Sequence, residues 1–333
     1  MLEHGGNLNL AAKQYGIPRE NWLDLSTGIN PNGYPIPDIP ASAWQRLPAD
    51  DDELIEAACA YYGCKFAVPT AGSQAALQLL PTLRPACKVA MLSPMYQEHT
   101  HAWQRHGHQV HYFSNLTDQV LIDADVVLLC NPNNPSAKSF PPSELLSLHH
   151  KLSARNGWLI VDEAFIDATP EQSIATYSHL KGLFVLRSLG KFFGLAGARV
   201  GFLLGAEQVL MQAQNIIGPW SLTGPSRFVA QQALMDAVWQ QQTRLALLAS
   251  SARLAALLER YSLSPNAGTA LFQFTPNNQA IEWRDYLAKK GILVRLFHAN
   301  AELGQQSALR FGLPSENGWE HLENALKEAP IKD

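Results

Sequence analysis

The sequence has little charge and no excess of basic residues. Its 333 residues include 25 Lys and Arg against 29 Asp and Glu, which gives a formal net charge of −4. A protein that binds nucleic acid through its phosphates carries a basic patch or stripe, so this composition disfavours that class. A small anionic substrate would have to be held by a local group of arginines or lysines.

Long apolar runs and cysteines are also scarce. The chain contains no run of about 18 apolar residues, and its first ten residues, MLEHGGNLNL, lack the basic and apolar regions of a secretory signal. Cys59, Cys64, Cys87 and Cys130 form no C-x-x-C pair, so we expect no metal site. They are too few for a disulfide scaffold in a chain of this length. We therefore expect reduced thiols, a cytoplasmic protein and no membrane partner.

Continuous apolar runs lie between residues 86 and 205, and each of them ends in polar residues. They are KVAMLSP at 88–94, DVVLLCNP at 125–132, GWLIVDEAF at 157–165 and LFVLRS at 183–188. Uninterrupted runs of this kind are typical of parallel strands that are covered on both faces. Ligands of such α/β sheets bind at the carboxyl ends of the strands. The sequence therefore predicts an α/β domain with its site at those ends.

The rest of the chain is organised around this predicted sheet. Residues 1–40 are rich in Gly, Asn and Pro and predict an extended N-terminal arm, and residues 41–215 form the predicted large domain. Residues 216–333 are expected to contain a long helix over residues 225–260 and a smaller α+β C-terminal domain. The strand candidates of that domain are TALFQFT at 269–275, GILVRLF at 291–297 and SALRFGLP at 307–314.

Polar residues at the predicted strand ends form an ordered series. TAGSQAALQLL at 70–80 is a small-residue turn that opens a helix, where free N–H groups suit a phosphate. Tyr96 follows a strand and could stack on a flat cofactor, and Asn134, in a proline-fixed loop, could donate to a phenolate oxygen. Asp162 ends a buried strand, where a carboxylate needs a partner such as a protonated pyridine nitrogen. Taken singly, these features also fit a capped helix, a core tyrosine and an ordinary loop.

The stretch RSLGKFFGLAGARVG at 187–201 completes the series. Lys191 lies among small residues, with Ser188 three positions before it and Arg199 eight positions after it. A lysine amine that has lost its proton forms a Schiff base with an aldehyde. A serine hydroxyl and the planar fork of an arginine can both bind one phosphate. A lysine between glycines is by itself more often a solvated loop residue, but the ordered series favours a cofactor site.

With these motifs in this order, the chain resembles the fold-type I, aspartate-aminotransferase-like enzymes that use pyridoxal 5′-phosphate (PLP). It most resembles the branch that contains histidinol-phosphate aminotransferases and threonine-phosphate decarboxylases of cobalamin synthesis. The resemblance implies a large domain with a mostly parallel sheet, a smaller C-terminal α+β domain and a homodimer. It implies that Lys191 is the catalytic residue and binds PLP covalently. The further cofactor contacts that it implies are Gly72, Ser73, Ser188 and Arg199 at the phosphate, with Gln74 as an additional candidate, Tyr96 over the ring, Asn134 at the 3′ oxygen and Asp162 at the ring nitrogen.

The resemblance also supplies candidates for binding a small phosphorylated amino-acid substrate. Arg310, in ALRFG, matches the residue that binds the substrate α-carboxylate in this family. Arg295, in GILVRLF, matches an arginine for the side-chain phosphate, with a surface strand arginine as the alternative. The segments HGGN and STGINP resemble the N-terminal arm of the decarboxylases, in which His4, Gly5 and Asn30 would close over the substrate.

Two positions depart from the aminotransferase pattern. Phe165 stands in DEAF where the aminotransferases of this branch have DEAY. Leu47 stands in RLPADDD where they have a tyrosine, in a stretch like RYPD, that reaches the cofactor phosphate of the neighbouring subunit. We expect decarboxylation of L-threonine O-3-phosphate to (R)-1-amino-2-propanol O-2-phosphate and CO₂. This expectation rests on Phe165, on the N-terminal arm and on the two arginines. A histidinol-phosphate aminotransferase is the alternative, and the intact site disfavours a non-catalytic PLP-binding protein.

Overall fold

The computed structural model describes residues 4–49, 52–300 and 305–330, and the chain divides into two compact units. The smaller unit comprises Met1–Asn32, Pro135–Ala137 and Thr243–Asp333, and the larger unit comprises Gly33–Asn134 and Lys138–Gln242. The domain borders that the sequence predicts, after residues 40 and 215, remain a prediction.

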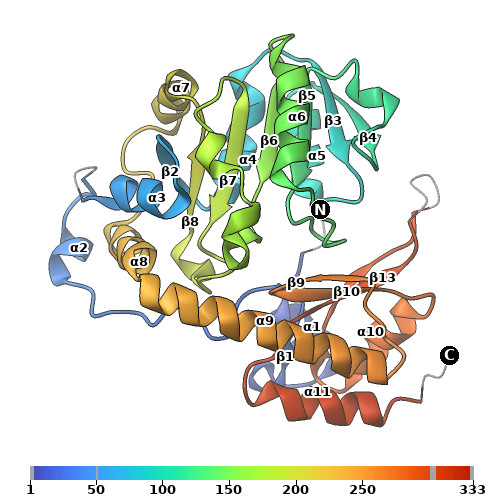
Figure 1. Cartoon of the computed structure of the whole chain (residues 1–333). Coiled ribbons are helices and arrows are strands. Elements are labelled where there is room, and N and C mark those ends of the chain that lie inside the picture. Colours follow the sequence, from blue (N-terminus) through green and yellow to red (C-terminus); the bar gives the residue numbers. More distant parts are fainter. Residues whose placement is uncertain (1–3, 50–51, 301–304, 331–333) are drawn as a thin grey trace. The chain divides into compact units, whose positions relative to one another are not determined.

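Within the described residues, the larger unit is built on a seven-stranded sheet with helices on both faces (Figure 1). The strand order is β2–β8–β7–β6–β5–β3–β4, and all neighbours are parallel except that β8 is antiparallel to β2 and β7. The strands are β2 (Ala67–Ala71), β3 (Lys88–Leu92), β4 (Gln109–Phe113), β5 (Val126–Cys130), β6 (Trp158–Asp162), β7 (Leu183–Ser188) and β8 (Val200–Leu204). The predicted α/β fold with a mostly parallel sheet is therefore confirmed.

The four apolar runs predicted as strands are confirmed as β3, β5, β6 and β7. Every residue of β5 and β7 is buried, which explains why these runs show no alternation of polar and apolar residues. The edge strands β2 and β4 were not predicted. Pro69 interrupts the strand pattern of β2, and β4 is largely exposed at its edge of the sheet.

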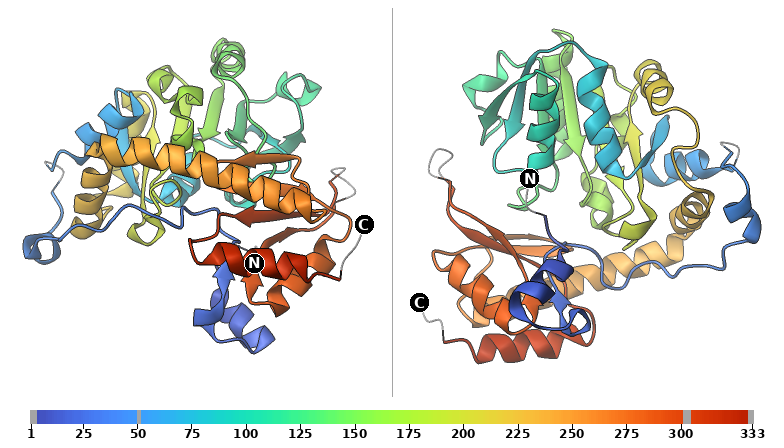
Figure 2. Two further views of the ribbon diagram at one scale, coloured as in Figure 1. Left: turned by 60° about the horizontal axis from the view of Figure 1, so that its bottom comes forward. Right: turned by 180° about the vertical axis from the view of Figure 1, so that it is seen from behind.

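The helices of the larger unit connect these strands and cover the sheet. Helix α6 lies on one face of the sheet, and α4 and α5 lie on the other (Figures 1 and 2). The helices are α2 (Ala41–Gln45), α3 (Leu54–Tyr62), α4 (Ser73–Leu79), α5 (Gln97–Arg105), α6 (Pro142–Ser153), α7 (Glu207–Ile217), α8 (Gly224–Met235) and α9 (Ala237–Arg260), and α9 continues into the smaller unit.

The single long helix predicted over residues 225–260 is wrong. The structure has α8 and α9 there, separated by Asp236, whose φ of −84° and ψ of 76° are not helical. The Asp236 Oδ1 atom accepts a hydrogen bond from the Trp239 backbone nitrogen at 2.9 Å and caps the start of α9. This cap satisfies a helix-end N–H group, so the side chain of Asp236 begins a new helix.

The smaller unit has, in its described part, a four-stranded antiparallel sheet of order β12–β13–β10–β9 and a parallel pair, β1–β11. The predicted extended arm contains a helix, because Asn7 caps α1 and Gly16 ends it in the left-handed conformation. Two predicted strands are each divided, one into β9 and β10 and the other into β11 and β12. The elements are α1 (Leu8–Tyr15), β1 (Leu23–Asp24), β9 (Ala267–Thr269), β10 (Phe272–Pro276), α10 (Ala280–Lys289), β11 (Ile292–Leu293), β12 (Arg295–Phe297), β13 (Ala308–Gly312) and α11 (Gly318–Lys327).

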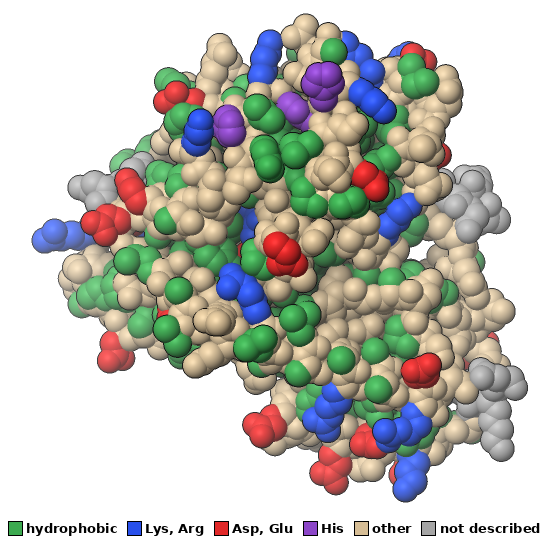
Figure 3. Space-filling view, viewed as in Figure 1, with side chains coloured by type: hydrophobic (Ala, Val, Ile, Leu, Met, Phe, Trp, Pro, Cys, Tyr) green, Lys and Arg blue, Asp and Glu red, His purple; other side chains and the backbone are tan. Residues whose placement is uncertain are grey.

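The surface and the helices can also be compared with those of nucleic-acid-binding and membrane-spanning proteins, two classes that the sequence disfavours. On the face that Figure 3 shows, basic and acidic side chains are interspersed among hydrophobic and other polar ones. This mixture differs from the basic stripe of a nucleic-acid-binding surface. Among the helices of the described residues, none combines the length and the apolar character that a membrane crossing requires.

Candidate active site

The predicted phosphate contacts meet where β2, β7 and β8 approach one another in the larger unit. Gly72 has a φ of +72°, and a Cβ atom there would lie 2.5 Å from Arg199 Nη2, so glycine is required. Ser188 pairs with Gly201 across β7 and β8, and a Cβ atom on Gly201 would lie 2.3 Å from the backbone nitrogen of Ser73. The structure therefore brings these predicted phosphate contacts together around a tightly packed, glycine-rich backbone.

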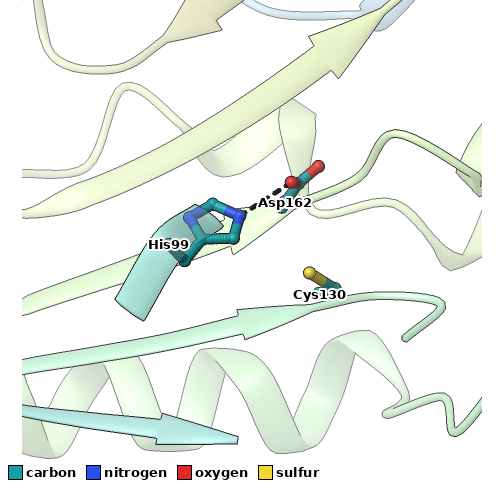
Figure 4. A group of neighbouring side chains, drawn as sticks. All are labelled: His99, Cys130 and Asp162. Atoms are coloured by element: carbon teal, nitrogen blue, oxygen red, sulfur yellow. Dashed lines mark hydrogen bonds and ion pairs between the residues drawn. The ribbon is translucent and has the colours of Figure 1, made fainter. Parts of the chain in front are cut away.

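Asp162, at the carboxyl end of β6, is buried and paired. Its Oδ2 atom lies 2.9 Å from His99 Nε2, and its Oδ1 atom accepts a hydrogen bond from the Ala164 backbone nitrogen at 3.0 Å (Figure 4). His99 is 1% exposed and lies in the first turn of α5. The sequence analysis missed His99, although it follows Tyr96, the residue just before α5, by only three residues, and the two rings lie 6.1 Å apart between their centres.

The Cys130 thiol lies beside this pair, at the end of β5 (Figure 4). Ligand atoms of Cys130, His99 and Asp162 lie within 4.8 Å of one another, and all three residue types can bind metals. Burial and the charge of Asp162 raise the pKa of the Cys130 thiol, which accepts hydrogen bonds from the backbone N–H groups of Tyr96 and Asn134. A protonated thiol is a poor metal ligand. We therefore interpret Cys130 as a link between the two loops that carry Tyr96 and Asn134.

Tyr96 is connected to the start of α4 by side-chain hydrogen bonds. Its hydroxyl donates to Gln74 Oε1 at 3.4 Å, and Gln74 Nε2 donates to Glu98 Oε2 at 3.2 Å. Burial, together with the charge of Glu98, raises the pKa of Tyr96 to about 12, so its phenol is protonated at neutral pH. These bonds hold the Tyr96 ring in a defined position, and they engage Gln74 with Tyr96 and Glu98.

Lys191 follows β7 in a loop that is fixed by aromatic packing. Phe192 and Phe193 are both fully buried, and the Phe193 ring stacks on the Trp239 ring with 5.6 Å between their centres. Lys191 Nζ lies 5.4 Å from the centre of the buried Phe165 ring. The loop therefore fixes the Lys191 backbone and places its amine near an aromatic ring that has no hydroxyl group.

A buried charge network joins the ends of β6 and β7. Arg187 Nη1 donates to Glu163 Oε2 at 2.8 Å, and Nη2 donates to Asp167 Oδ1. Burial disfavours the charge of Arg187, but Asp167 and Glu163 outweigh it and raise the pKa of the guanidinium. Because Glu163 follows Asp162 and Arg187 precedes Ser188, the network stabilises the two strand ends that carry these candidate cofactor contacts.

In the smaller unit, Arg295 and Arg310 are direct partners across β12 and β13. Arg310 is 5% exposed, and its Nη2 atom donates to the Ser26 carbonyl oxygen at 2.7 Å. Burial and the charge of Arg295 lower the pKa of Arg310 to about 10. The guanidinium carbons of Arg295 and Arg310 lie 5.4 and 5.9 Å from the centre of the Phe297 ring. Two like charges this close repel each other, so an anion between them would be bound favourably.

The N-terminal segment also contacts Ser26. A Cβ atom on Gly5 would lie 2.4 Å from the Ser26 carbonyl oxygen, which is the atom that Arg310 contacts. Asn30 is buried, and its Oδ1 atom accepts a hydrogen bond from the backbone nitrogen two residues ahead. His4 is exposed. The structure therefore brings Gly5 and Arg310 to one backbone oxygen, and the predicted site residues form two groups, one in each unit.

The fold and these two groups define a class of protein. A family model described as aminotransferase class I and II matches residues 44–328. The chain belongs to this family, whose members bind PLP.

Among the relatives of this chain are threonine-phosphate decarboxylases and histidinol-phosphate aminotransferases. A threonine-phosphate decarboxylase of Pseudomonas aeruginosa is 50% identical over 328 residues, which cover 98% of this chain and 97% of the relative. A histidinol-phosphate aminotransferase of Thermoanaerobacter pseudethanolicus is 30% identical over 209 residues, which cover 61% of this chain and 56% of the relative. The solved histidinol-phosphate aminotransferase of Sinorhizobium meliloti, in complex with pyridoxal-5′-phosphate, has a TM-score of 0.81 at 20% identity and covers 98% of this chain and 95% of its own. This last likeness shows the fold alone.

The donor set of the larger unit fits PLP. The Arg199 guanidinium lies directly against the Gly72 backbone, and its planar fork can bind a phosphate with charge-assisted hydrogen bonds. The buried carboxylate of Asp162 suits a ring nitrogen that carries a proton, and the amine of Lys191 suits an aldehyde.

Proposed function

We propose that this chain is a PLP-dependent decarboxylase that converts L-threonine O-3-phosphate to (R)-1-amino-2-propanol O-2-phosphate and CO₂ in cobalamin biosynthesis. The observation that carries the proposal is the 50% identity to the threonine-phosphate decarboxylase of Pseudomonas aeruginosa over nearly the whole length of both chains. The facing pair Arg295 and Arg310 supports it, because this substrate carries two anionic groups on a short chain.

Lys191 is the catalytic residue in this proposal, and Asp162 would pair with the ring nitrogen. When bound, PLP supplies an electron sink for the bond that breaks at the substrate Cα. Asp162 would hold a proton at the ring nitrogen, and His99 holds the Asp162 carboxylate in place through its hydrogen bond of 2.9 Å. Lys191 would hold the cofactor through its amine until a substrate amine takes its place. The freed Lys191 amine would then deliver a proton to the substrate Cα after CO₂ has left.

The remaining contacts of the larger unit bind and orient the cofactor. Its phosphate would be held by the backbone at Gly72 and Ser73, the Ser188 hydroxyl and the Arg199 guanidinium. Tyr96 would hold the pyridine ring by stacking, with Gln74 fixed beside it, and the Asn134 amide would donate to the 3′ oxygen. Phe165 contributes packing there but no hydrogen bond, since it has no hydroxyl group.

The choice of reaction follows from how the substrate is held. Only the Cα bond that stands perpendicular to the cofactor ring overlaps its π system, so the substrate anchors decide between loss of a proton and loss of CO₂. In this proposal Arg310 binds the carboxylate and Arg295 binds the side-chain phosphate, with Gly5, His4 and Asn30 closing over the substrate. Fixing both ends of a short substrate would orient its carboxylate for loss as CO₂.

We further infer that the enzyme is a homodimer. Trp44 and Leu47, in and just after α2, are each 69% exposed, and Trp220 and Val238 of the same unit are also exposed. Large aromatic and aliphatic side chains of this kind are enriched in subunit interfaces, and two-fold dimers are the commonest oligomers. Sedimentation of the PLP-loaded enzyme is expected to show a dimer. An active species that sediments only as a monomer would contradict this inference.

Two substrate assays test the proposed reaction. Purified enzyme with PLP receives L-threonine O-3-phosphate without any keto acid in one assay, and histidinol phosphate with 2-oxoglutarate in the other. The proposal predicts CO₂ release in the first assay and no glutamate in the second, and Lys191→Ala is expected to be inactive in both. Glutamate formation in the second assay without CO₂ release in the first would establish the aminotransferase alternative.

A further inference from the structure

Ser26 contacts both the N-terminal segment, residues 4–7, and strand β13 of the smaller unit, and it is 2% exposed. The backbone just before it is held from two sides. The Leu25 backbone nitrogen donates to the Leu293 carbonyl oxygen of β11 at 2.8 Å, and the Gly312 backbone nitrogen of β13 donates to the Leu25 carbonyl oxygen at 2.6 Å. A Cβ atom on Gly312 would lie 3.1 Å from that same oxygen, so glycine permits the close approach. Ser26 therefore follows a fixed backbone.

The Ser26 hydroxyl links Asp24 to the N-terminal segment. It donates a hydrogen bond to Asp24 Oδ1 at 2.6 Å, and the same carboxylate oxygen accepts one from the Ser26 backbone nitrogen at 2.9 Å. The hydroxyl oxygen accepts a hydrogen bond from the Gly6 backbone nitrogen at 2.7 Å. Because a hydroxyl has one hydrogen atom and two lone pairs, its donation to Asp24 leaves the oxygen to act as an acceptor for Gly6. The charged acceptor polarises the hydroxyl and strengthens the bond from Gly6.

The Ser26 carbonyl oxygen is in contact with both the N-terminal segment and Arg310. Arg310 Nη2 donates a hydrogen bond to it at 2.7 Å, and a Cβ atom on Gly5 would overlap with it, so only glycine fits there. Gly6 has a φ of +81°, in the left-handed region that favours glycine. The charge of Asp24 also counteracts the lowering of the Arg310 pKa. Ser26 therefore holds the N-terminal segment with its hydroxyl and Arg310 with its carbonyl group.

We propose that Ser26 is a positioning residue for substrate binding, which orders the N-terminal segment beside Arg310. This inference rests on the proposed function, in which Arg310 binds the substrate carboxylate and the N-terminal segment closes over the substrate. A site whose binding-competent conformation is only partly populated binds its ligand more weakly, in proportion to that fraction. The hydrogen bond from Gly6 orders the segment before the substrate arrives, so less conformational entropy is lost on binding. Ser26 thus acts on substrate affinity and not on the bond that breaks at Cα.

Replacing Ser26 with alanine tests this role in the PLP-loaded, full-length enzyme. Ser26→Ala removes the acceptor of the Gly6 N–H group but keeps the carbonyl oxygen that Arg310 contacts. The loss of one such hydrogen bond should raise KM for L-threonine O-3-phosphate about fivefold, with little change in kcat. Hydrogen exchange of the Gly6 amide, measured without substrate by mass spectrometry with residue-level fragmentation, should become about fivefold faster.

Ser251 provides the matched control for a general loss of stability. It is also a buried serine of the smaller unit, and its hydroxyl donates to the Thr269 carbonyl oxygen at 2.6 Å and accepts from Gln273 Nε2 at 2.7 Å. Ser251→Ala should therefore lower the melting temperature, because it also removes buried hydrogen bonds. It should leave both KM and the exchange rate of the Gly6 amide at their wild-type values.

Either of two results would overturn the proposal. One is an unchanged exchange rate of the Gly6 amide in Ser26→Ala, and the other is a KM that rises equally in Ser26→Ala and Ser251→Ala. The exchange measurement needs no substrate, so it is independent of the proposed reaction. If the wild-type enzyme releases no CO₂ from L-threonine O-3-phosphate, the proposed reaction fails, and the exchange rate still decides whether Ser26 holds the N-terminal segment.

Discussion

Replacing Arg295 with alanine should separate the two anion-binding roles proposed for the smaller unit. Arg295 stands directly opposite Arg310 on the neighbouring strand, and its charge is one cause of the lowered pKa of Arg310. The substitution removes the proposed partner of the substrate phosphate and, at the same time, the repulsion between the two guanidiniums. We therefore expect Arg295→Ala to fold normally, with a melting temperature no lower than that of the wild type.

The expected kinetic effect follows from the strength of one charge-assisted interaction. A bidentate arginine–phosphate pair contributes about 1.5–3 kcal/mol, which corresponds to roughly 10–150-fold in affinity. Arg295 is only partly buried, so solvent screening favours the lower end of this range. We expect kcat/KM for L-threonine O-3-phosphate to fall about tenfold, whereas kcat/KM for unphosphorylated L-threonine should change little.

The assay compares the two substrates across three variants. Arg310→Ala should impair both substrates, because both carry the carboxylate that Arg310 is proposed to bind. Arg295→Lys keeps the charge but loses the planar fork, so its loss should lie between those of the wild type and Arg295→Ala. Equal fractional losses for threonine and phosphothreonine in Arg295→Ala would refute the phosphate role of Arg295.

Four further predictions concern the larger unit. Borohydride reduction of the PLP-loaded protein should fix the cofactor on Lys191, and recovery on another lysine would refute that assignment. His99→Leu removes the hydrogen bond to Asp162 and should weaken PLP binding by about tenfold, and an unchanged dissociation constant in a fluorescence titration would contradict its positioning role. Cys130→Ala should also weaken PLP binding, with partial recovery in Cys130→Ser, whereas equal affinity in all three proteins would count against the link between the two loops. Phe165→Tyr should raise transamination relative to decarboxylation, and an unchanged product ratio would exclude Phe165 from the choice of reaction.

Local patterns predicted the parts of the fold that local chemistry determines. The central strands β5 and β7 are buried along their whole length, so their sequences were readable as continuous apolar runs. The edge strands and the division of the long helix at Asp236 were missed. The sequence did not predict β2 because a proline interrupts it, and it did not predict β4 because that strand is largely exposed. It did not predict the helix division because the Asp236 cap can be recognised only once the backbone path is known.

In the candidate site, too, residues of one short motif were predicted, whereas contacts between distant parts of the sequence were not. Lys191, Ser188 and Arg199 were predicted together because they lie within one short motif. The pairing of His99 with Asp162 joins residues 63 positions apart, and no local spacing encodes it. The facing arrangement of Arg295 and Arg310 likewise depends on the register between two strands, which the sequence pattern leaves open.

The central claim is that this chain removes the substrate carboxylate, and one measurement tests it most directly. PLP-loaded enzyme receives a single equivalent of L-threonine O-3-phosphate that is isotopically labelled at its carboxyl carbon, and the label and the cofactor are recovered after one turnover. The account predicts that all of the label leaves as CO₂ and that the cofactor is recovered in its aldehyde form. Label retained in a 2-oxo acid, with the cofactor recovered in its aminated form, would contradict it.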